Sequence, residues 1–460
     1  MTSCNNNTQQ EATKELEQFG YQQQLKRSLG VWQLTAFGLN YMIPIAPALI
    51  FGFILVSSGG TVALPYLLAM IAMLFTANSY SLMIQAFPFA GSLYSYVSRG
   101  WSARIGFIAG WVLLLDYILI PTVTAAGAAT YIHAFFPLIP YPVWLFIFAV
   151  LTGLVNLFGV ELMATVGLWM LLIGEVVIFT GFWVWGHYVV EQHGIQALWS
   201  QTPFHFSSIH AVSTATAMAV LSYLGFDAIT TLSEEANNPH KDIPRAIFIR
   251  VIIGGATMFI TGYLGVLAIG HWQQYAHDTT WQAAALFHLA EHTGGKAFSV
   301  FYASGFIIAM AVFNVVASAA GSRLLFGMGR DGVLPRSIFA AINQRFNTPH
   351  WNIIIIVVLE YCIGSALSID HISELVNFGA IIGFLLLNIT IIIFFYRNQT
   401  SINLNHPPST PHWRKLLCPS LGALIMIWLI TGMPVLMLTT GCCWLALGII
   451  ASYAPNSILR

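Results

Sequence analysis

The sequence has very few charged residues for its length. Asp, Glu, Lys and Arg make up 7% of its 460 residues, whereas 57% are hydrophobic or aromatic. A soluble domain carries about 25% charged residues, because its core needs a hydrated surface. A soluble fold is therefore excluded, and so is a β-barrel, whose strands alternate polar and apolar residues. The sequence predicts an all-α polytopic membrane protein.

An excess of one charge, paired cysteines and catalytic motifs are also missing. Lys plus Arg and Asp plus Glu balance at 17 each, which argues against a nucleic-acid partner. The five cysteines show no metal-ligand spacing, and adjacent Cys442 and Cys443 are poorly placed for a disulfide. No Gly-x-Ser-x-Gly, His-Glu-x-x-His or Walker lysine motif is present. We therefore expect no enzyme activity, no cofactor and no metal site.

The apolar residues form twelve stretches long enough to be membrane spans. A spanning helix needs about 20 apolar residues. Residues 1–28 are polar and lack the features of a cleavable signal, so we expect a disordered cytoplasmic tail there. The predicted spans are residues 32–56, 62–84, 103–126, 140–158, 163–186, 209–233, 247–270, 298–321, 351–368, 372–396, 416–438 and 440–454.

The basic residues predict that both termini lie in the cytoplasm. Lys and Arg resist translocation, so they accumulate in inner loops. With the N-terminus inside, every Lys and Arg except Lys296 lies in an inner segment, Arg250 among them. On this interpretation no basic residue lies at mid-span.

Four carboxylates lie well inside the predicted spans: Asp116, Glu175, Asp227 and Glu360. Ionisable residues inside a membrane usually face protein or a water-filled path and serve a function. Without basic partners, these acids indicate protonation, a cationic ligand, or both. The alternative for each is a protonated carboxyl bonded to a neighbouring carbonyl.

Asp227 is the strongest candidate because Gly225 lies two residues before it. A glycine in mid-span allows a helix to break and to offer free backbone groups to a cavity. The first span has a matching interruption at Pro44 and Pro47. These spans lie five apart, as two inverted five-helix repeats would place them. The alternative is an ordinary proline kink together with a packing glycine.

Several motifs resemble those of the amino acid–polyamine–organocation transporters. Residues 223–247 are similar to their helix 6 signature, residues 314–335 to the end of helix 8, and residues 87–117 to the helix 2–3 region. Within that superfamily, the motifs most similar to bacterial putrescine importers are Leu115-Asp-Tyr117, Gly225-Phe-Asp-Ala228, Ser233-Glu-Glu235 and Asn377-Phe-Gly-Ala380.

The resemblance implies an architecture and a mechanism. The first inverted repeat would span residues 29–187 and the second 188–397, with two further helices in 398–460. Import would proceed by alternating access in a bacterial inner membrane, driven by protons or, as the second choice, by sodium.

Two departures from the family pattern affect the expected substrate and coupling. Amino acid transporters usually hold the substrate carboxylate on a glycine-rich break in helix 1, whereas here no glycine lies between Gly38 and Gly52. This favours an amine or polyamine over an amino acid. In helix 5, many relatives have a lysine where this chain has Glu175, an acid that could carry the coupling proton, bind sodium or contact a cationic substrate.

The expected site combines the two breaks with helix 3. Asp227 is the predicted amine anchor and, with Glu175, a candidate for ion coupling. Glu234, Glu235 and Arg323 are assigned to an inner gate, although a solvated helix end is an equal alternative for the two glutamates. The other predicted substrate-binding residues are Tyr41, Pro44, Tyr223, Gly225, Phe226, Asp116 and Tyr117.

The function that follows is proton-coupled import of putrescine or a related polyamine. An amino acid permease of the same superfamily, coupled to protons or sodium, is the first alternative. A channel or a membrane sensor is a remoter one.

Overall fold

The computed structural model describes residues 27–42, 46–88, 93–158, 161–233, 235–330, 334–343, 348–398 and 411–453. The regular structure in these residues is helical. The only strand-like pairing in this part of the chain is an isolated bridge between Leu29 and Ala236. The all-α prediction is therefore confirmed.

Ten helical segments in the described part are long and apolar enough to cross a membrane. They agree with the predicted polytopic class. Nine lie within one labelled helix each, although the helix Ala285–Arg330 is interrupted at Gly295 (φ 73°), and the tenth is the composite segment Ile209–Leu232. The nine are α4 (Ala63–Ala86), α6 (Ala103–Phe135), α7 (Tyr141–Phe158), α8 (Glu161–His193), α10 (Pro239–Ile269), α12 (Ala285–Arg330), α15 (Ile369–Asn398), α16 (His412–Thr431) and α17 (Val435–Ser452).

The remaining predicted spans contain shorter helices. The stretch expected to be the first span consists of α2 (Val31–Met42) and α3 (Pro47–Ser58), and the ninth is α14 (His350–Ala366). Pro47 stands at the first position of α3, where its missing N–H costs nothing. Shorter elements lie between the long helices: α5 (Leu93–Gly100), η1 (Ile195–Trp199), η2 (Thr202–Phe204), η5 (Trp272–Tyr275), α11 (Thr279–Ala283) and α13 (Arg336–Phe339).

Two predicted boundaries were wrong. The turn between the last two helices lies at residues 432–434 rather than near residue 439, because Pro434 stops the preceding helix. α10 begins at Pro239 rather than at residue 247. There the Asn238 side chain accepts a hydrogen bond from the Lys241 N–H at 3.2 Å, while Asp242 accepts one from the Asn238 N–H at 2.9 Å. This reciprocal capping starts the helix two turns early.

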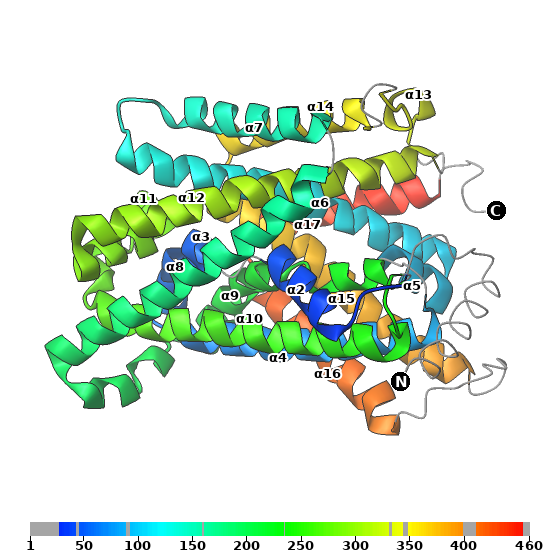
Figure 1. The fold of residues 1–460 in the computed structure, drawn as a ribbon. Coiled ribbons are helices and arrows are strands. Elements are labelled where there is room, and N and C mark those ends of the chain that lie inside the picture. Colours follow the sequence, from blue (N-terminus) through cyan, green and yellow to red (C-terminus); the bar gives the residue numbers. More distant parts are fainter. Residues whose placement is uncertain are drawn as a thin grey trace.

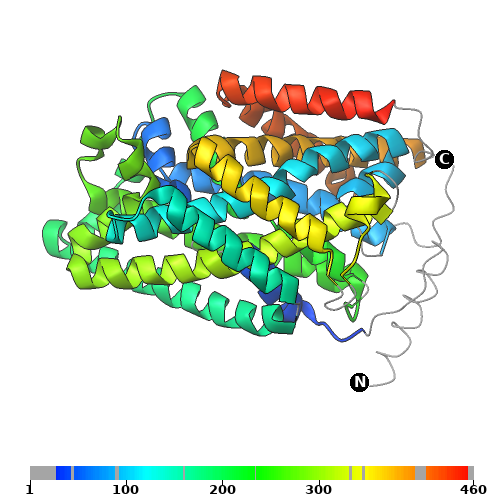
Figure 2. The ribbon, with the colours of Figure 1, turned by 90° about the horizontal axis from the view of Figure 1, so that it is seen from above.

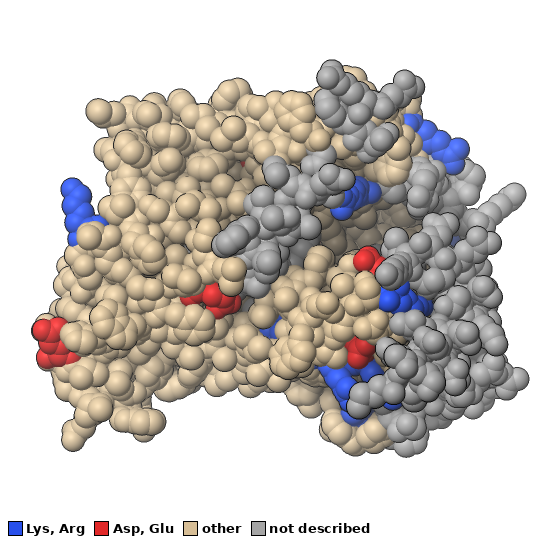
Figure 3. Space-filling model, in the orientation of Figure 1, with Lys and Arg blue, Asp and Glu red and all other residues tan. Residues whose placement is uncertain are grey.

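The long helices lie side by side with their axes roughly along one line, and α6 lies at the centre of the bundle (Figures 1 and 2). α6 contacts α5, α7, α12, α14, α15 and α17, whereas α4 contacts α9 (Ile209–Ala219), α10, α15 and α16. On the face drawn in Figure 3, most charged side chains lie near the two ends of the helices, and the surface between them is almost entirely uncharged. This is the surface expected of a protein that spans a bilayer.

Candidate functional site

The sixth predicted span is broken at Gly225. It begins as α9 (Ile209–Ala219), tightens into η3 (Val220–Tyr223) and resumes as η4 (Phe226–Leu232). Between η3 and η4, Gly225 has φ 88° and ψ −1°, a left-handed conformation that costs a residue with a Cβ atom free energy. The predicted interruption of this helix is present, and it leaves backbone carbonyls without helical partners.

Arg250 of α10 occupies those free carbonyls. Its side chain is 0% exposed. Its Nε donates to the Gly38 carbonyl at 3.0 Å, and its two terminal nitrogens donate to the Tyr223 and Leu224 carbonyls at 3.0 and 3.1 Å. The guanidinium carbon also lies 5.8 Å from the centre of the Phe226 ring. One buried cation therefore joins α2 to the break in the sixth span.

The burial of Arg250 corrects the expectation that no basic residue lies at mid-span. Because α10 starts at Pro239, Arg250 lies three turns inside the helix rather than in an inner loop. Arg250 and Asp227 lie on the two sides of the break, but no ion pair within 4 Å joins these two described residues. The position was detectable, since residue 250 already fell inside the predicted span 247–270.

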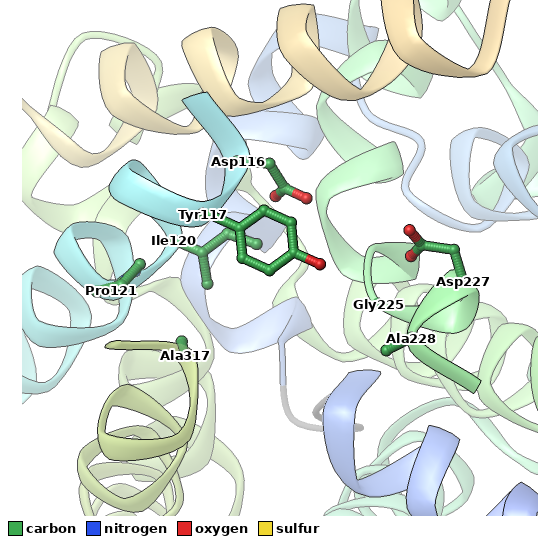
Figure 4. Close-up of a pocket in the computed structure, with 8 residues that line it drawn as sticks. All are labelled: Asp116, Tyr117, Ile120, Pro121, Gly225, Asp227, Ala228 and Ala317. Atoms are coloured by element: carbon green, nitrogen blue, oxygen red, sulfur yellow. The ribbon is translucent and has the colours of Figure 1, made fainter. Parts of the chain in front are cut away.

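A small hollow lies between α6, the break and α12 (Figure 4). With its opening it encloses about 320 Å³, but only about one water-sized sphere fits without moving side chains. A ligand larger than water therefore requires side-chain movement. The hollow is lined by Asp116, Tyr117, Ile120, Pro121, Gly225, Asp227, Ala228 and Ala317.

Two carboxylates enter this hollow from opposite helices. Figure 4 shows Asp116 on α6 and Asp227 on η4 pointing toward each other, with the Tyr117 ring beside them. The Tyr80 hydroxyl donates to Oδ2 of Asp227 at 3.4 Å, whereas Oδ1 of Asp116 is buried without a hydrogen-bond partner among the described residues. A buried acid with an oxygen that lacks a donor, as in Asp116, requires a proton or a cation.

Two of the predicted aromatic residues do not line the hollow. Tyr223 is 0% exposed and its hydroxyl donates to the Tyr66 carbonyl at 2.7 Å. Phe226 is also fully buried, and its ring centre lies 5.5 Å from that of Tyr80 and 5.4 Å from that of Phe384. Both residues shape the break through packing. Tyr117 is the one predicted aromatic residue among those that line the hollow.

Part of the predicted site in the first span lies outside the described residues. Tyr41 belongs to α2, but its side chain is among those the structure does not describe, and Pro44 falls in the undescribed residues 43–45. In the described part, α2 packs against η4 and α10, and its Gly38 carbonyl accepts a hydrogen bond from Arg250.

Glu175 lies apart from the hollow. It is half-buried on α8. Of the two residues that follow it, Val176 is 57% exposed and Val177 is buried. No hydrogen bond or ion pair of its carboxyl occurs among the described residues. Glu175 therefore occupies the border between the lipid-facing and inward-facing sides of α8.

The segment before α2 is tied to the segment after η4, where the inner gate was predicted. The Glu235 carbonyl accepts hydrogen bonds from the Ser28 and Leu29 N–H groups at 2.9 and 3.0 Å. The Arg27 guanidinium donates to the Ser233 and Ala236 carbonyls at 3.3 and 3.1 Å. Of the other two predicted gate residues, Arg323 is exposed near the end of α12, and Glu234 lies outside the described residues.

Comparison with known proteins identifies relatives that match most of the chain. Residues 29–457 match the sequence pattern of the family described as amino acid permease. The low-affinity putrescine importer PlaP of Escherichia coli K12 is 31% identical over 440 residues, covering 93% of each chain. The branched-chain amino acid permease BcaP of Bacillus subtilis is 23% identical over 93% of this chain and 92% of its own. The aromatic amino acid transport protein AroP of Shigella flexneri is 25% identical over 70% of each chain.

Proposed function

Because the chain belongs to the amino acid permease family, and is thus an integral multi-pass membrane transporter and not an enzyme, we propose that it imports a diamine such as putrescine. The similarity to a putrescine importer supports this substrate class. Import would be secondary active transport by alternating access, with protons as the coupling ion and sodium as the less favoured choice.

The observation that carries the proposal is the pair of carboxylates in one hollow. Putrescine has an ammonium group at each end, and an ammonium leaving water loses several kcal/mol of hydration even after relaxation. Carboxylates with charge-assisted hydrogen bonds can offset that loss. Asp227 and Asp116 supply one acid for each end of a diamine, whereas the carboxylate of an amino acid would be repelled by at least one of them.

Each predicted residue has a proposed role. Asp227 anchors one ammonium, Asp116 receives the other, and the Tyr117 ring offers a cation–π contact. Gly225, Tyr223 and Phe226 form the break, and Tyr41 and Pro44 contribute from the first span. Glu175 or Asp227 carries the coupling proton, while Glu234, Glu235 and Arg323 belong to the inner gate.

The proposed architecture follows the family. Residues 29–187 and 188–397 form two inverted repeats, residues 398–460 add two helices, and all twelve predicted spans cross the membrane. The broken first and sixth spans occupy corresponding positions in the two repeats. Both termini lie in the cytoplasm, and the membrane is the bacterial inner membrane.

Import of an amino acid is the second candidate, because two of the relatives are named as permeases for branched-chain and aromatic amino acids. The helix 1 segment argues against it. Between Gly38 and Gly52 it offers prolines at 44 and 47, which cannot donate to a substrate carboxylate.

Uptake into proteoliposomes tests the proposal. Vesicles containing the purified protein receive radiolabelled putrescine under an imposed proton gradient, with a sodium gradient in a parallel sample. Unlabelled diamines, monoamines, lysine, leucine and phenylalanine are the competitors. We expect accumulation above the outside concentration under the proton gradient, with diamines as the strongest competitors. Competition by amino acids but by no amine would overturn the proposal in favour of the second candidate, and equilibration without accumulation would indicate a channel.

A further inference from the structure

A third carboxyl, in addition to Asp116 and Asp227, lies buried behind one wall of the hollow. Glu360 of α14 is 0% exposed, and its Oε1 accepts a hydrogen bond from Nδ2 of Asn314 on α12 at 2.8 Å. The same nitrogen donates to the Thr152 hydroxyl of α7 at 2.9 Å. The other oxygen of Glu360, Oε2, is buried without a hydrogen-bond partner in the described part of the chain.

The cluster around Glu360 is joined to the helices that line the hollow. Oδ1 of Asn314 accepts from the Thr124 hydroxyl of α6 at 3.3 Å. Thr124 follows the lining residue Pro121 by one turn, and its one hydroxyl proton is shared between Asn314 and the carbonyls of Ile120 and Pro121, at 3.1 and 2.9 Å. Asn314 precedes the lining residue Ala317 by one turn of α12. The amide of Asn314 thus lies between Glu360 and the wall of the hollow.

No charged group among the described residues compensates Glu360. On the helices packed against α14, Asp116 and Tyr117 of α6 point into the hollow, and the Tyr141 hydroxyl of α7 donates to the Gly364 carbonyl at 3.0 Å. Arg323 of α12 and Arg336 of α13 are exposed. The other ionisable residues of α6 and α12 lie two turns or more from Thr124 and Asn314. Burial of Glu360 and its hydrogen bond from Asn314 are the two interactions that act on this carboxyl group.

We propose that Glu360 is a proton-binding site of the transport cycle, linked to the hollow through Asn314 and Thr124. An ionised carboxylate with a single hydrogen bond and no cation is too costly in such a place, so Glu360 holds a proton in this conformation. The proton forms an O–H bond at Oε2 on arrival from water and returns to water when that bond breaks. No other bond changes.

The link to the hollow explains how a bound cation acts on this proton. Asp116 and Thr124 belong to the same helix, so a shift of α6 on ligand binding changes the distance from Thr124 to Asn314. Asn314 is the hydrogen-bond donor to Glu360, and its movement changes the free energy of the ionised carboxyl. This inference rests on the proposed function for the ligand, but the protonation of Glu360 is independent of the ligand's identity.

Infrared spectroscopy tests the protonation without any substrate. The purified protein at neutral pH is compared with Glu360→Gln by difference spectroscopy in H₂O and D₂O. We expect a carbonyl band of a protonated carboxylic acid, shifted in D₂O, that the parent shows and the variant lacks. A carboxylate band in its place would overturn the proposal, whether or not the protein transports an amine.

Uptake tests the coupling. With the membrane potential clamped at zero, we expect Glu360→Gln to retain exchange of labelled for unlabelled putrescine but to lose accumulation driven by a proton gradient, which a single coupled proton sustains roughly tenfold per pH unit. Glu374→Gln on α15 is the matched control, because Glu374 is also buried, at 6% exposure, but lines a different hollow. If Glu360→Gln does not fold, Asn314→Ser removes the donor and should shift the pH profile. Parental accumulation and pH profile in the folded variants would overturn the coupling role.

Discussion

The indoles of Trp111 and Trp444 each donate a hydrogen bond to the other residue's backbone carbonyl, at 2.9 and 3.0 Å. Their rings stack with centroids 4.7 Å apart. Gly448 lies directly against Trp111, where even a Cβ atom would come within 2.3 Å of the indole. The last described helix, α17, is in this way fastened to the central helix α6, although most of its surface faces outward.

This reciprocal pair predicts a loss of stability in Trp444→Phe. Phenylalanine keeps an aromatic ring for stacking but removes one indole donor and leaves the Trp111 carbonyl without it. A hydrogen bond between membrane helices contributes about 0.6–1.7 kcal/mol. The midpoint of thermal unfolding in detergent should fall measurably, whereas Trp413→Phe, at a side chain 57% exposed on α16, should leave it unchanged. Equal midpoints for the two variants would contradict a role for the pair.

Replacing Arg250 should destabilise the break. Arg250→Met leaves the Gly38, Tyr223 and Leu224 carbonyls without their donor, and breaking a buried charged network usually costs about 3–5 kcal/mol. Arg250→Lys should recover only part of this lost stability, because one ammonium group cannot make the several hydrogen bonds of the planar guanidinium. Thermal unfolding and uptake are the measurements. The control is Arg245→Met, because Arg245 is an exposed arginine of the same helix. An equally large loss of stability and uptake in this variant would show that the effect of Arg250→Met is not specific to the break.

Substitutions of the two carboxylates, Asp227 and Asp116, should affect the uptake of diamines and monoamines differently. Asp227→Asn removes the anchor and should lower uptake of both kinds of amine about 100-fold, as expected for a loss of roughly 3 kcal/mol. Asp116→Asn should impair diamine uptake but spare a monoamine, which needs one acid only. The ratio of diamine to monoamine uptake is the measurement, and binding of putrescine to Asp227→Asn with parental affinity would rule out the anchor role.

Gly225→Val should weaken transport without preventing membrane insertion. At φ 88° a residue with a Cβ atom costs about 1–2 kcal/mol, and a β-branched side chain costs the most. We expect parental expression with a reduced uptake rate. Gly186→Val is the matched control, since Gly186 lies within α8 with no other atom within 4 Å of an added Cβ. Normal uptake by Gly225→Val would show that the left-handed turn is dispensable.

Glu175→Gln should separate binding from coupling if Glu175 carries the proton. The glutamine keeps the shape of the side chain but cannot take up a proton. Uptake by the parent should rise as the external pH falls, whereas the variant should show a flat profile with its affinity for putrescine unchanged. An unchanged pH profile would assign the coupling proton to another acid, with Asp227 and Glu360 as the remaining candidates.

The sequence predicted those features of the site that depend on local backbone chemistry. Gly225 beside Asp227 indicated a break, and the break is present; Asp116 was named with Asp227, and both line the same hollow. Residue types alone could not show which way a side chain points. Tyr223 and Phe226 are as aromatic as Tyr117, but helical rotation directs them into packing rather than into the hollow.

The error at Arg250 has a different origin. The charge rule assigns a basic residue near a span's end to the inner loop, because an unpaired charge is costly in the membrane. Here the carbonyls that the break in the preceding span leaves unpaired accept hydrogen bonds from the guanidinium. This compensation appears only in the folded bundle. The same limit applies to Glu360, whose hydrogen-bond partner Asn314 comes from α12.

The pairing of the segment before α2 with the segment after η4 has a consequence for biosynthesis. Arg27 and its acceptor Ala236 are separated by 209 positions in the chain. At about 5–20 residues per second, the ribosome makes the acceptor roughly ten to forty seconds after the donor. During this interval the Arg27 guanidinium lacks the carbonyls that accept its hydrogen bonds in the folded protein, and water can hydrate it instead. The segment before α2 therefore reaches its final place only after the sixth predicted span has been made.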